Sequence, residues 1–483
     1  SGTELIVVNA EDRDEPELVT KLTLAWNADR VVEHGDHLLQ IENGYSWQGS
    51  KSPTIRVTTQ NNLDVSLAKI DLESGGVVGV KKDERYLYVA RLVERNDQVQ
   101  REVEPKPAPD EDEGGEEKEP AKEDPDRETE PAPEIIWDWV YSAEFSVDVI
   151  DLNDPTEPVV LGTAEQVFDS RNGTSGLNAV VGTMVGDTLI WRPDIQANSG
   201  GFYRGGPFID DIAIDVAFEG DAIWGGGYYG GGYPYFDKVQ LIAVDVAKPS
   251  EPAIISSLEV DPKDYAEFGP ISVLGSDFYV SFKESLLSES IYIHRHKMRV
   301  LDFSDPRAPK LGAVVSVPGM VEGVFQPDTE GVILFSTIPK VRQDEEVWFS
   351  TSNSLLQASV FDGSQAFLVS QVTVEDGRYT PTLVIEDRIV KPGFDNKDAG
   401  LRVWRWKPSD EGGELEDDGF VDLGATPSQV QEHEGLIFTE ANRTISVVDK
   451  ELTLIASTAL SGPVYTQNLK QIDVSADRSE AWI

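Results

Sequence analysis

The sequence predicts an all-β protein folded as a single β-propeller, with eight four-stranded blades or, as the alternative, seven. Three observations lead to this fold: a hairpin motif that recurs along the chain, a second strand pair that alternates with it, and half-units at the two chain ends. Repeats of this kind are typical of a ring of antiparallel sheets. Residues 1–483 are therefore expected to form one propeller domain.

The first unit is a strand–turn–strand hairpin in which Asp and Pro recur at the same spacing along the chain. Four stretches share it: VIDLNDPTEP (149–158), AVDVAKPSEP (243–252), VLDFSDPRAP (300–309) and, more weakly, VNAEDRDEP (8–16). Alternating apolar residues around each turn are typical of half-buried strands. An Asp at a strand end can bond to its own backbone, and Pro fixes φ. We therefore expect Asp151, Asp245 and Asp302 to be structural turn residues.

The second unit is a pair of short strands around a polar turn. It occurs at residues 31–41, 79–90, 180–191, 271–282, 323–335, 382–392, 430–440 and 472–483. We name these strands a and b, and those of the hairpin motif c and d. Divergent c–d hairpins follow four of the pairs, at residues 54–72, 356–374, 401–423 and 445–460.

The two ends of the chain carry complementary half-units. The chain begins with a c–d hairpin that has no a–b pair, and it ends with an a–b pair that has no c–d hairpin. Joined, they make a further four-stranded sheet, which is how β-propellers close their ring. The sequence thus predicts a ring closed by the N- and C-terminal strands.

The DxSDPxxP hairpins resemble the LVIVD-type repeats of secreted bacterial and archaeal β-propeller proteins. The likeness is clear in three hairpins and weaker in the fourth. It implies the propeller fold and an extracytoplasmic setting, whether secreted, periplasmic or at the cell surface. It implies no particular reaction.

The composition restricts the partners. The chain has 87 acidic and 41 basic side chains and a formal net charge of −46, so a nucleic-acid partner is not expected. The absence of cysteine excludes disulfides and thiolate metal sites. No apolar run is long enough for a transmembrane segment. The chain opens with Ser-Gly, which is compatible with a removed export signal or lipid anchor.

The longest insertions are expected to leave one face of the ring, since b–c connections all emerge on the same side. Their ranges are Asn43–Pro53, Glu94–Glu134, Pro193–Asp237, Ser285–Lys297 and Ile338–Asn353. Within them, residues 102–134 carry 15 acidic side chains, 4 basic ones and seven prolines, and should be disordered. Residues 193–237 form an insertion rich in glycine and aromatic residues. Because loops on a rigid scaffold often carry function, this face is the predicted working surface.

Aromatic residues of these insertions are the candidate binding residues, because Tyr and Trp are enriched at recognition sites. The candidates are Trp47, Tyr203, Trp224, Tyr228, Tyr229, Tyr233, Tyr235 and Trp348. Packing within the loops is the alternative for each of them. Gly225, Gly227 and Gly230 match G-x-G-x-x-G, but a strand rather than a helix follows them, so a dinucleotide site is not expected.

Metal binding is weakly indicated at two places. His294 and His296 share one side of a predicted strand, although Arg295 and Lys297 flank them and oppose a cation. Asp210 and Asp211 could contribute oxygens to a calcium site. His34 and His37 are expected to be solvated turn residues. No cofactor is predicted, and calcium remains open as a ligand.

Taken together, these features predict a non-catalytic binding scaffold, secreted or at the cell surface, that engages a protein or a polysaccharide through the insertion-bearing face. The alternative is a calcium-assisted hydrolase or lyase with its site at the mouth of the propeller channel. Fold alone does not choose between them.

Overall fold

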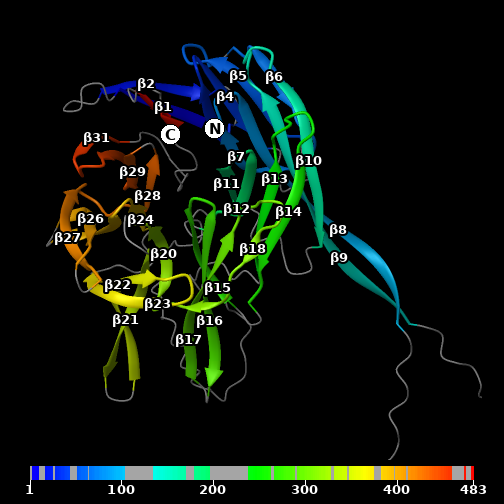
Figure 1. Ribbon diagram of the computed structural model, residues 1–483. Helices are drawn as coiled ribbons and strands as arrows, with labels where there is room; N and C mark the ends of the chain where they lie inside the picture. The colour runs from blue at the N-terminus through cyan, green and yellow to red at the C-terminus, as the bar shows by residue number, and fades with distance from the viewer. Residues whose placement is uncertain are drawn as a thin grey trace, which may run out of the picture.

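In the computed structural model the chain is a β-propeller of four-stranded antiparallel blades, as the sequence predicts (Figure 1). The structure describes residues 3–482 except 10–16, 25–27, 44–51, 64, 104–133, 170–178, 196–237, 263–265, 289–290, 328–330, 345–346, 375–381, 396–397, 410–411, 434, 460–472 and 475–479. Within these residues no helix is long and apolar enough to span a membrane.

The described strands form eight sheets, and within each the order follows a, b, c, d. Blade 1 contains β3 (Arg30–His34), β4 (His37–Glu42), β5 (Thr54–Thr59) and β6 (Ala68–Asp71). Blade 2 contains β7 (Gly76–Lys82), β8 (Tyr86–Val103), β9 (Glu134–Asp151) and β10 (Val159–Asp169). Blade 3 contains β11 (Val180–Val185), β12 (Thr188–Pro193), β13 (Val239–Asp245) and β14 (Ala253–Val260).

The next four blades keep this order. Blade 4 contains β15 (Ala266–Leu274), β16 (Asp277–Ser288), β17 (Ile291–Asp302) and an interrupted outer strand, β18 (Lys310–Leu311) and β19 (Val315–Ser316). Blade 5 contains β20 (Met320–Phe325), β21 (Val332–Asp344), β22 (Val347–Phe361) and β23 (Ala366–Val374). Blade 6 contains β24 (Leu383–Ile385), β25 (Arg388–Asp395), β26 (Asp398–Lys407) and β27 (Glu414–Asp422). Blade 7 contains β28 (Gln429–His433), β29 (Leu436–Ala441), β30 (Thr444–Asp449) and β31 (Leu454–Ala459).

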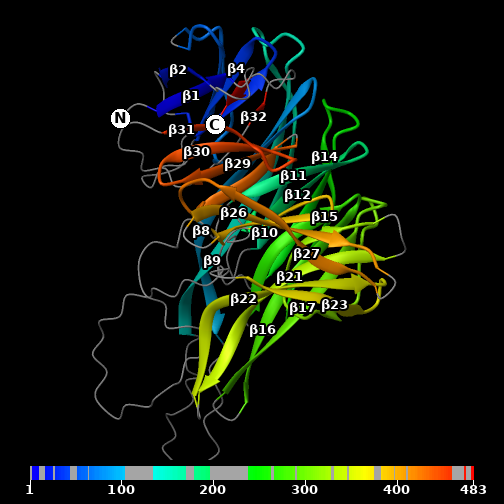
Figure 2. The same cartoon turned by 90° about the vertical axis from the view of Figure 1, so that its left-hand side faces the viewer.

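The closing blade joins the two ends of the chain, which confirms the predicted ring closure. It contains β1 (Thr3–Asn9), β2 (Glu17–Leu24), β32 (Asp473–Val474) and β33 (Glu480–Trp482), in the order β2-β1-β33-β32. The N-terminal strand pairs with the C-terminal one, with Val7 opposite Trp482. In both ribbon views these strands lie together on one side of the ring (Figures 1 and 2).

Most of the hydrophobic core lies between neighbouring blades, and one described cluster, around Phe438, lies within blade 7. Apolar clusters join blades 1 and 2, 2 and 3, 3 and 4, 4 and 5, 5 and 6, and 6 and 7. Trp191 is fully buried in the cluster between blades 2 and 3. Each blade can bury its apolar face only against its neighbours, so the described blades depend on one another for stability.

The inner strands approach closely because one of them carries glycine at the contact. A Cβ built on Gly79 of β7 would lie 2.6 Å from both Cγ2 and the carbonyl oxygen of Val180 on β11. Backbone and buried side chain together leave no room for a larger residue there. This contact sets the spacing of blades 2 and 3.

Candidate functional site

Three of the b–c connections are extended hairpins that continue their blades. Strands β8 and β9 pair from Tyr86–Asp151 out to Val103–Glu134, β16 and β17 pair out to Ser288–Ile291, and β21 and β22 pair out to Asp344–Val347. All three project in the same direction from the ring (Figures 1 and 2).

These hairpins differ from the sequence expectation, which treated the same segments as loop insertions. The polar run ERNDQVQ (94–100) reads as a loop on its own, yet its backbone pairs in register with residues 137–143 of β9, four of which are β-branched or aromatic. Cross-strand partners of that type support a strand that its own composition does not predict. Residues 102, 103 and 134 of the predicted disordered segment also belong to these strands, and the rest of that segment lies outside the described residues.

Most of the predicted binding residues lie outside the described part of the chain. This holds for Trp47, Tyr203, Trp224, Tyr228, Tyr229, Tyr233 and Tyr235, and for the metal candidates Asp210 and Asp211. Trp348 lies in β22, where its backbone is opposite Gln343 near the tip of an extended hairpin. The structure thus describes the backbone of one of the eight aromatic candidates, and the role of all eight stays a prediction.

The two histidine metal candidates lie on β17. His296 is opposite Lys283 in the register of β16 and β17, and Lys283 is in turn opposite Glu267 of β15. Lys283 Nζ lies 2.7 Å from Glu267 Oε2, so the Glu267 carboxylate is already paired with a cation. His294 lies two residues farther along the same strand, opposite Ser285. Among the described residues, no group of three or more His, Asp and Glu could hold a metal ion.

The opposite face of the ring is formed by short a–b and c–d turns. The predicted turn role of the repeated Asp is confirmed there: the Oδ1 atoms of Asp151, Asp245 and Asp302 accept hydrogen bonds from the backbone N two residues on, at 2.9, 3.0 and 2.8 Å. This is the Asx turn, in which the carboxylate accepts a hydrogen bond from a backbone N–H group in the turn that follows the strand. These carboxylates are therefore part of the scaffold.

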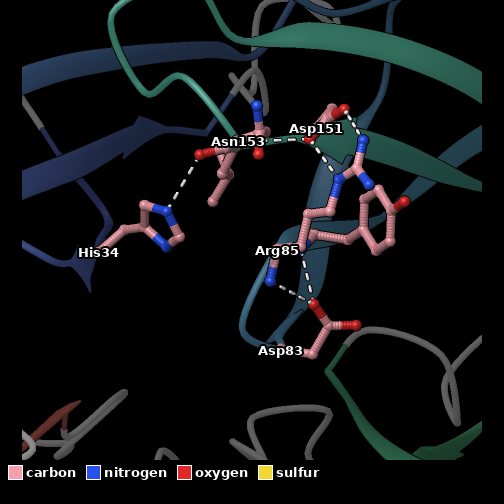
Figure 3. Close-up of polar contacts among 7 residues, drawn as sticks. His34, Asp83, Arg85, Asp151 and Asn153 are labelled. Carbon is pink, nitrogen blue, oxygen red and sulfur yellow. Dashed lines mark hydrogen bonds and ion pairs between the residues drawn. The ribbon is translucent and has the colours of Figure 1, made fainter.

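Where blades 1 and 2 meet on this face, three turns are joined by polar contacts (Figure 3). Arg85, in the β7–β8 turn, donates from Nε and Nη2 to the two carboxylate oxygens of Asp151, at 3.0 and 2.7 Å. Asp83 Oδ1 accepts from the backbone N of Arg85 and Tyr86, at 2.8 and 2.6 Å. The Arg85 hydrogen bond is the main cause that lowers the pKa of Asp151, so this carboxylate stays ionised.

His34 joins blade 1 to this cluster, contrary to the expectation of a solvated turn residue. It is half-buried, and its Nε2 donates to the carbonyl oxygen of Leu152 at 3.1 Å. Burial lowers the pKa of His34 from 6.5, the charge of Lys82 lowers it further, and the Leu152 hydrogen bond opposes both. Burial therefore favours the neutral ring, in which the contact with Leu152 requires the proton to be on Nε2.

We expect His34 to make stability depend on pH. Its folded pKa is lowered, so the unfolded chain binds the proton more strongly, and stability is lost as pH falls from 6.5 towards the lower folded pKa. His34→Gln keeps an N–H donor but does not titrate. The free energy of unfolding in urea should therefore fall more in the wild type than in His34→Gln between about pH 7.5 and about pH 5.5. Parallel pH profiles would contradict this role.

Two buried charge clusters were not anticipated from the sequence. Lys391 of β25 is fully buried, and its Nζ donates to Glu322 Oε2 of β20 at 2.7 Å, to Thr337 Oγ1 of β21 at 3.2 Å, and to Thr382 Oγ1. Three acceptors match the three donors of an ammonium group. Glu322, an acidic residue on an inner strand, is thereby used for joining blades 5 and 6. The available signal was a lysine within the apolar run RIVKPGF (388–394).

The second cluster lies within blade 2. Arg91 donates from Nε and Nη2 to the two oxygens of Asp148, at 2.5 and 3.0 Å, and from Nη1 to the Ser74 carbonyl oxygen at 2.8 Å. Both side chains of the pair are almost fully buried. Both carboxylate oxygens of Asp148 accept from the Arg91 guanidinium, so the two buried charges neutralise each other within the blade.

Comparisons with known proteins are limited to structural likeness. No protein-family model and no curated protein sequence matches this chain. Among solved structures, the β-propeller domain of the Trilobed protease from Pyrococcus furiosus has 9% identity and a TM-score of 0.35, over 91% of this chain and 98% of that one. The periplasmic gluconolactonase PpgL of Pseudomonas aeruginosa has 10% identity and a TM-score of 0.36, over 87% of this chain and 95% of that one. At these values the likeness carries no inference about activity, and the chain is a β-propeller protein without an assigned family.

Proposed function

We propose that this protein is a non-catalytic binding scaffold, secreted or at the cell surface, that engages a protein or a polysaccharide through the face bearing the extended b–c hairpins. The observation that carries the proposal is the asymmetry between the two faces. On one face β8–β9, β16–β17 and β21–β22 continue well beyond the sheets, whereas the a–b turns of blades 1, 3, 4 and 6 on the other face have two residues each.

Physical reasoning connects this asymmetry to binding. The blades are fixed by cores buried between them, so hairpins that extend from them are held in a defined arrangement. Paired strands also cost less ordering entropy on binding than free loops of the same length. The extracytoplasmic setting and the LVIVD-type repeat remain part of the proposal, supported by the DxSDPxxP hairpins.

The test shortens one hairpin without touching its blade. Residues 96–141 are replaced by Asn-Gly, which closes β8 onto β9 at the Arg95–Ser142 pair in a two-residue turn. A second variant lacks residues 197–236. Each is used in pull-downs from a surface-protein extract and on an array of polysaccharides. We expect at least one variant to lose a partner or a glycan that the full chain retains.

The matched control changes the opposite face. Lys248→Glu alters a side chain that is 77% exposed in the c–d turn of blade 3, and it should leave binding unchanged. Retention of every partner and glycan by both shortened variants would overturn the proposal. A rise in Tm with calcium that a chelator reverses, together with polysaccharide cleavage, would favour the calcium-assisted hydrolase or lyase instead.

A further inference from the structure

A cavity of about 320 Å³ lies between blades 6 and 7, on the face opposite the extended hairpins. It is bounded by the β24–β25 turn, by Arg405 of β26 and by the β30–β31 turn. Its volume is in the range of sites for small molecules, roughly 300–1,000 Å³. Nothing in the proposed binding function uses this cavity.

The lining combines an apolar floor with charges of both signs. Ile385 and Leu452 are half-buried and present apolar surface to the cavity, above the almost fully buried Val390 and Ile437. Arg388, Arg405 and Lys450 supply three positive charges, and Glu386, Asp387 and Glu451 supply three negative ones. Charges of both signs above an apolar surface fit a ligand that itself carries both charges and an apolar group.

The two arginines have different roles. Arg388 Nε lies 3.0 Å from Asp418 Oδ2, and its Nη1 donates to the Lys450 carbonyl oxygen across the blade boundary, so Arg388 holds the cavity walls together. Arg405 Nη2 lies 3.1 Å from Asp418 Oδ2, and its Nε lies 3.8 Å from Asp387 Oδ2. Within the part of the chain that the structure describes, these contacts leave the Nη1 donors of Arg405 for a ligand carboxylate.

Glu386 lies at a turn position where glycine is easier to accommodate. In the matching two-residue turns of blades 1, 3 and 4 this position is Gly35, Gly186 or Gly275, with φ of 58°, 58° and 60°. Glu386 has φ of 51°, in the left-handed region that disfavours residues with a Cβ. Its side chain is exposed at the cavity. A carboxylate held at a strained turn position, beside a cavity, indicates a role in binding.

From these contacts we propose that the cavity between blades 6 and 7 binds a small zwitterion of the α-amino-acid class with an apolar side chain. Arg405 receives the carboxylate, Glu386 and Glu451 receive the ammonium group, and the side chain packs on Ile385 and Leu452. A zwitterion has no net charge, so the net charge of −46 on the protein does not repel it.

The probe is leucine, with 4-methylpentanoate and isopentylamine as fragments that lack its ammonium group and its carboxylate, respectively. Binding is measured with the full chain by calorimetry and ligand-observed NMR. We expect saturable binding of leucine, with each fragment at least ~10-fold weaker because a charge-assisted contact is lost. 4-Methylpentanoate that binds as tightly as leucine, or no leucine binding at millimolar concentration, would overturn the proposal.

Variants separate binding from folding. Arg405→Gln should weaken the binding of leucine at least ~10-fold. The matched control is Arg402→Gln, on the same strand but on its other side: the two side chains are 32% and 30% exposed and each lies near two Asp residues. Glu386→Gly should weaken leucine binding while raising Tm, because glycine adopts the left-handed backbone conformation without strain.

Unchanged leucine affinity in Arg405→Gln and Glu386→Gly would show that these groups do not form the site. The hairpin variants described above should bind leucine normally, so failure here is distinct from failure of the proposed function.

Discussion

Lys391→Met is expected to lower the free energy of unfolding by about 3–5 kcal/mol, because it leaves the Glu322 carboxylate buried without its cation. Two hydroxyls remain beside that carboxylate, Thr337 Oγ1 at 2.8 Å and Thr382 Oγ1. They do not supply the missing charge. Urea unfolding followed by tryptophan fluorescence measures the loss.

Two further variants show whether the charge pair is the cause. Lys391→Met combined with Glu322→Leu removes both charges and should recover a large part of the loss, as replacing a whole buried pair often does. Lys69→Met breaks an ion pair with Asp71 in which both side chains are about half exposed, and should have a much smaller effect. If the double variant is no more stable than Lys391→Met, lost packing rather than the unpaired carboxylate causes the destabilisation.

Arg91→Met is expected to cost a similar amount, about 3–5 kcal/mol, by leaving Asp148 buried with only the Thr163 hydroxyl, 2.8 Å away. The change also leaves the Ser74 carbonyl oxygen without the hydrogen bond from Arg91. The same urea measurement applies. Amide hydrogen exchange of blade 2 then shows whether the loss extends beyond that blade.

The chain offers a matched control within the same sheet. Arg85 and Asp151 form a second two-bond Arg–Asp pair, between the β7–β8 turn and the end of β9, but the Arg85 side chain is 53% exposed whereas that of Arg91 is 2% exposed. Arg85→Met should therefore destabilise far less than Arg91→Met. Equal losses would mean that burial does not set the strength of these pairs.

The order of the strands could be predicted from sequence because each strand pair is a local feature. The alternating apolar residues and the Asp-x-x-x-Pro turns lie within about ten residues of one another. The regular alternation of the two kinds of strand pair also predicted the closing blade shared by the chain ends. The Asp151 turn was predictable for the same reason, since its partner is two residues away.

Contacts between blades were not predictable, because they join residues far apart in sequence. Glu322 and Lys391 are separated by 69 positions, and His34 and Leu152 by 118. Whether a lysine in an apolar strand is buried, or a turn histidine is covered, depends on which neighbour packs against it. The extended β8–β9 hairpin was mistaken for a loop for a related reason: the strand character of residues 94–100 comes from their partners on β9.

The pairing of β1 with β33 has a consequence for the order in which the ring forms. In an unstructured chain, bringing residues from opposite ends together would cost roughly 5 kcal/mol of loop-closure entropy. The three residue pairs between these strands could not offset that cost on their own. Once blades have stacked, they already hold the two ends near each other, and the effective concentration of one end at the other is high. The closing blade therefore completes a ring that the other blades have already assembled.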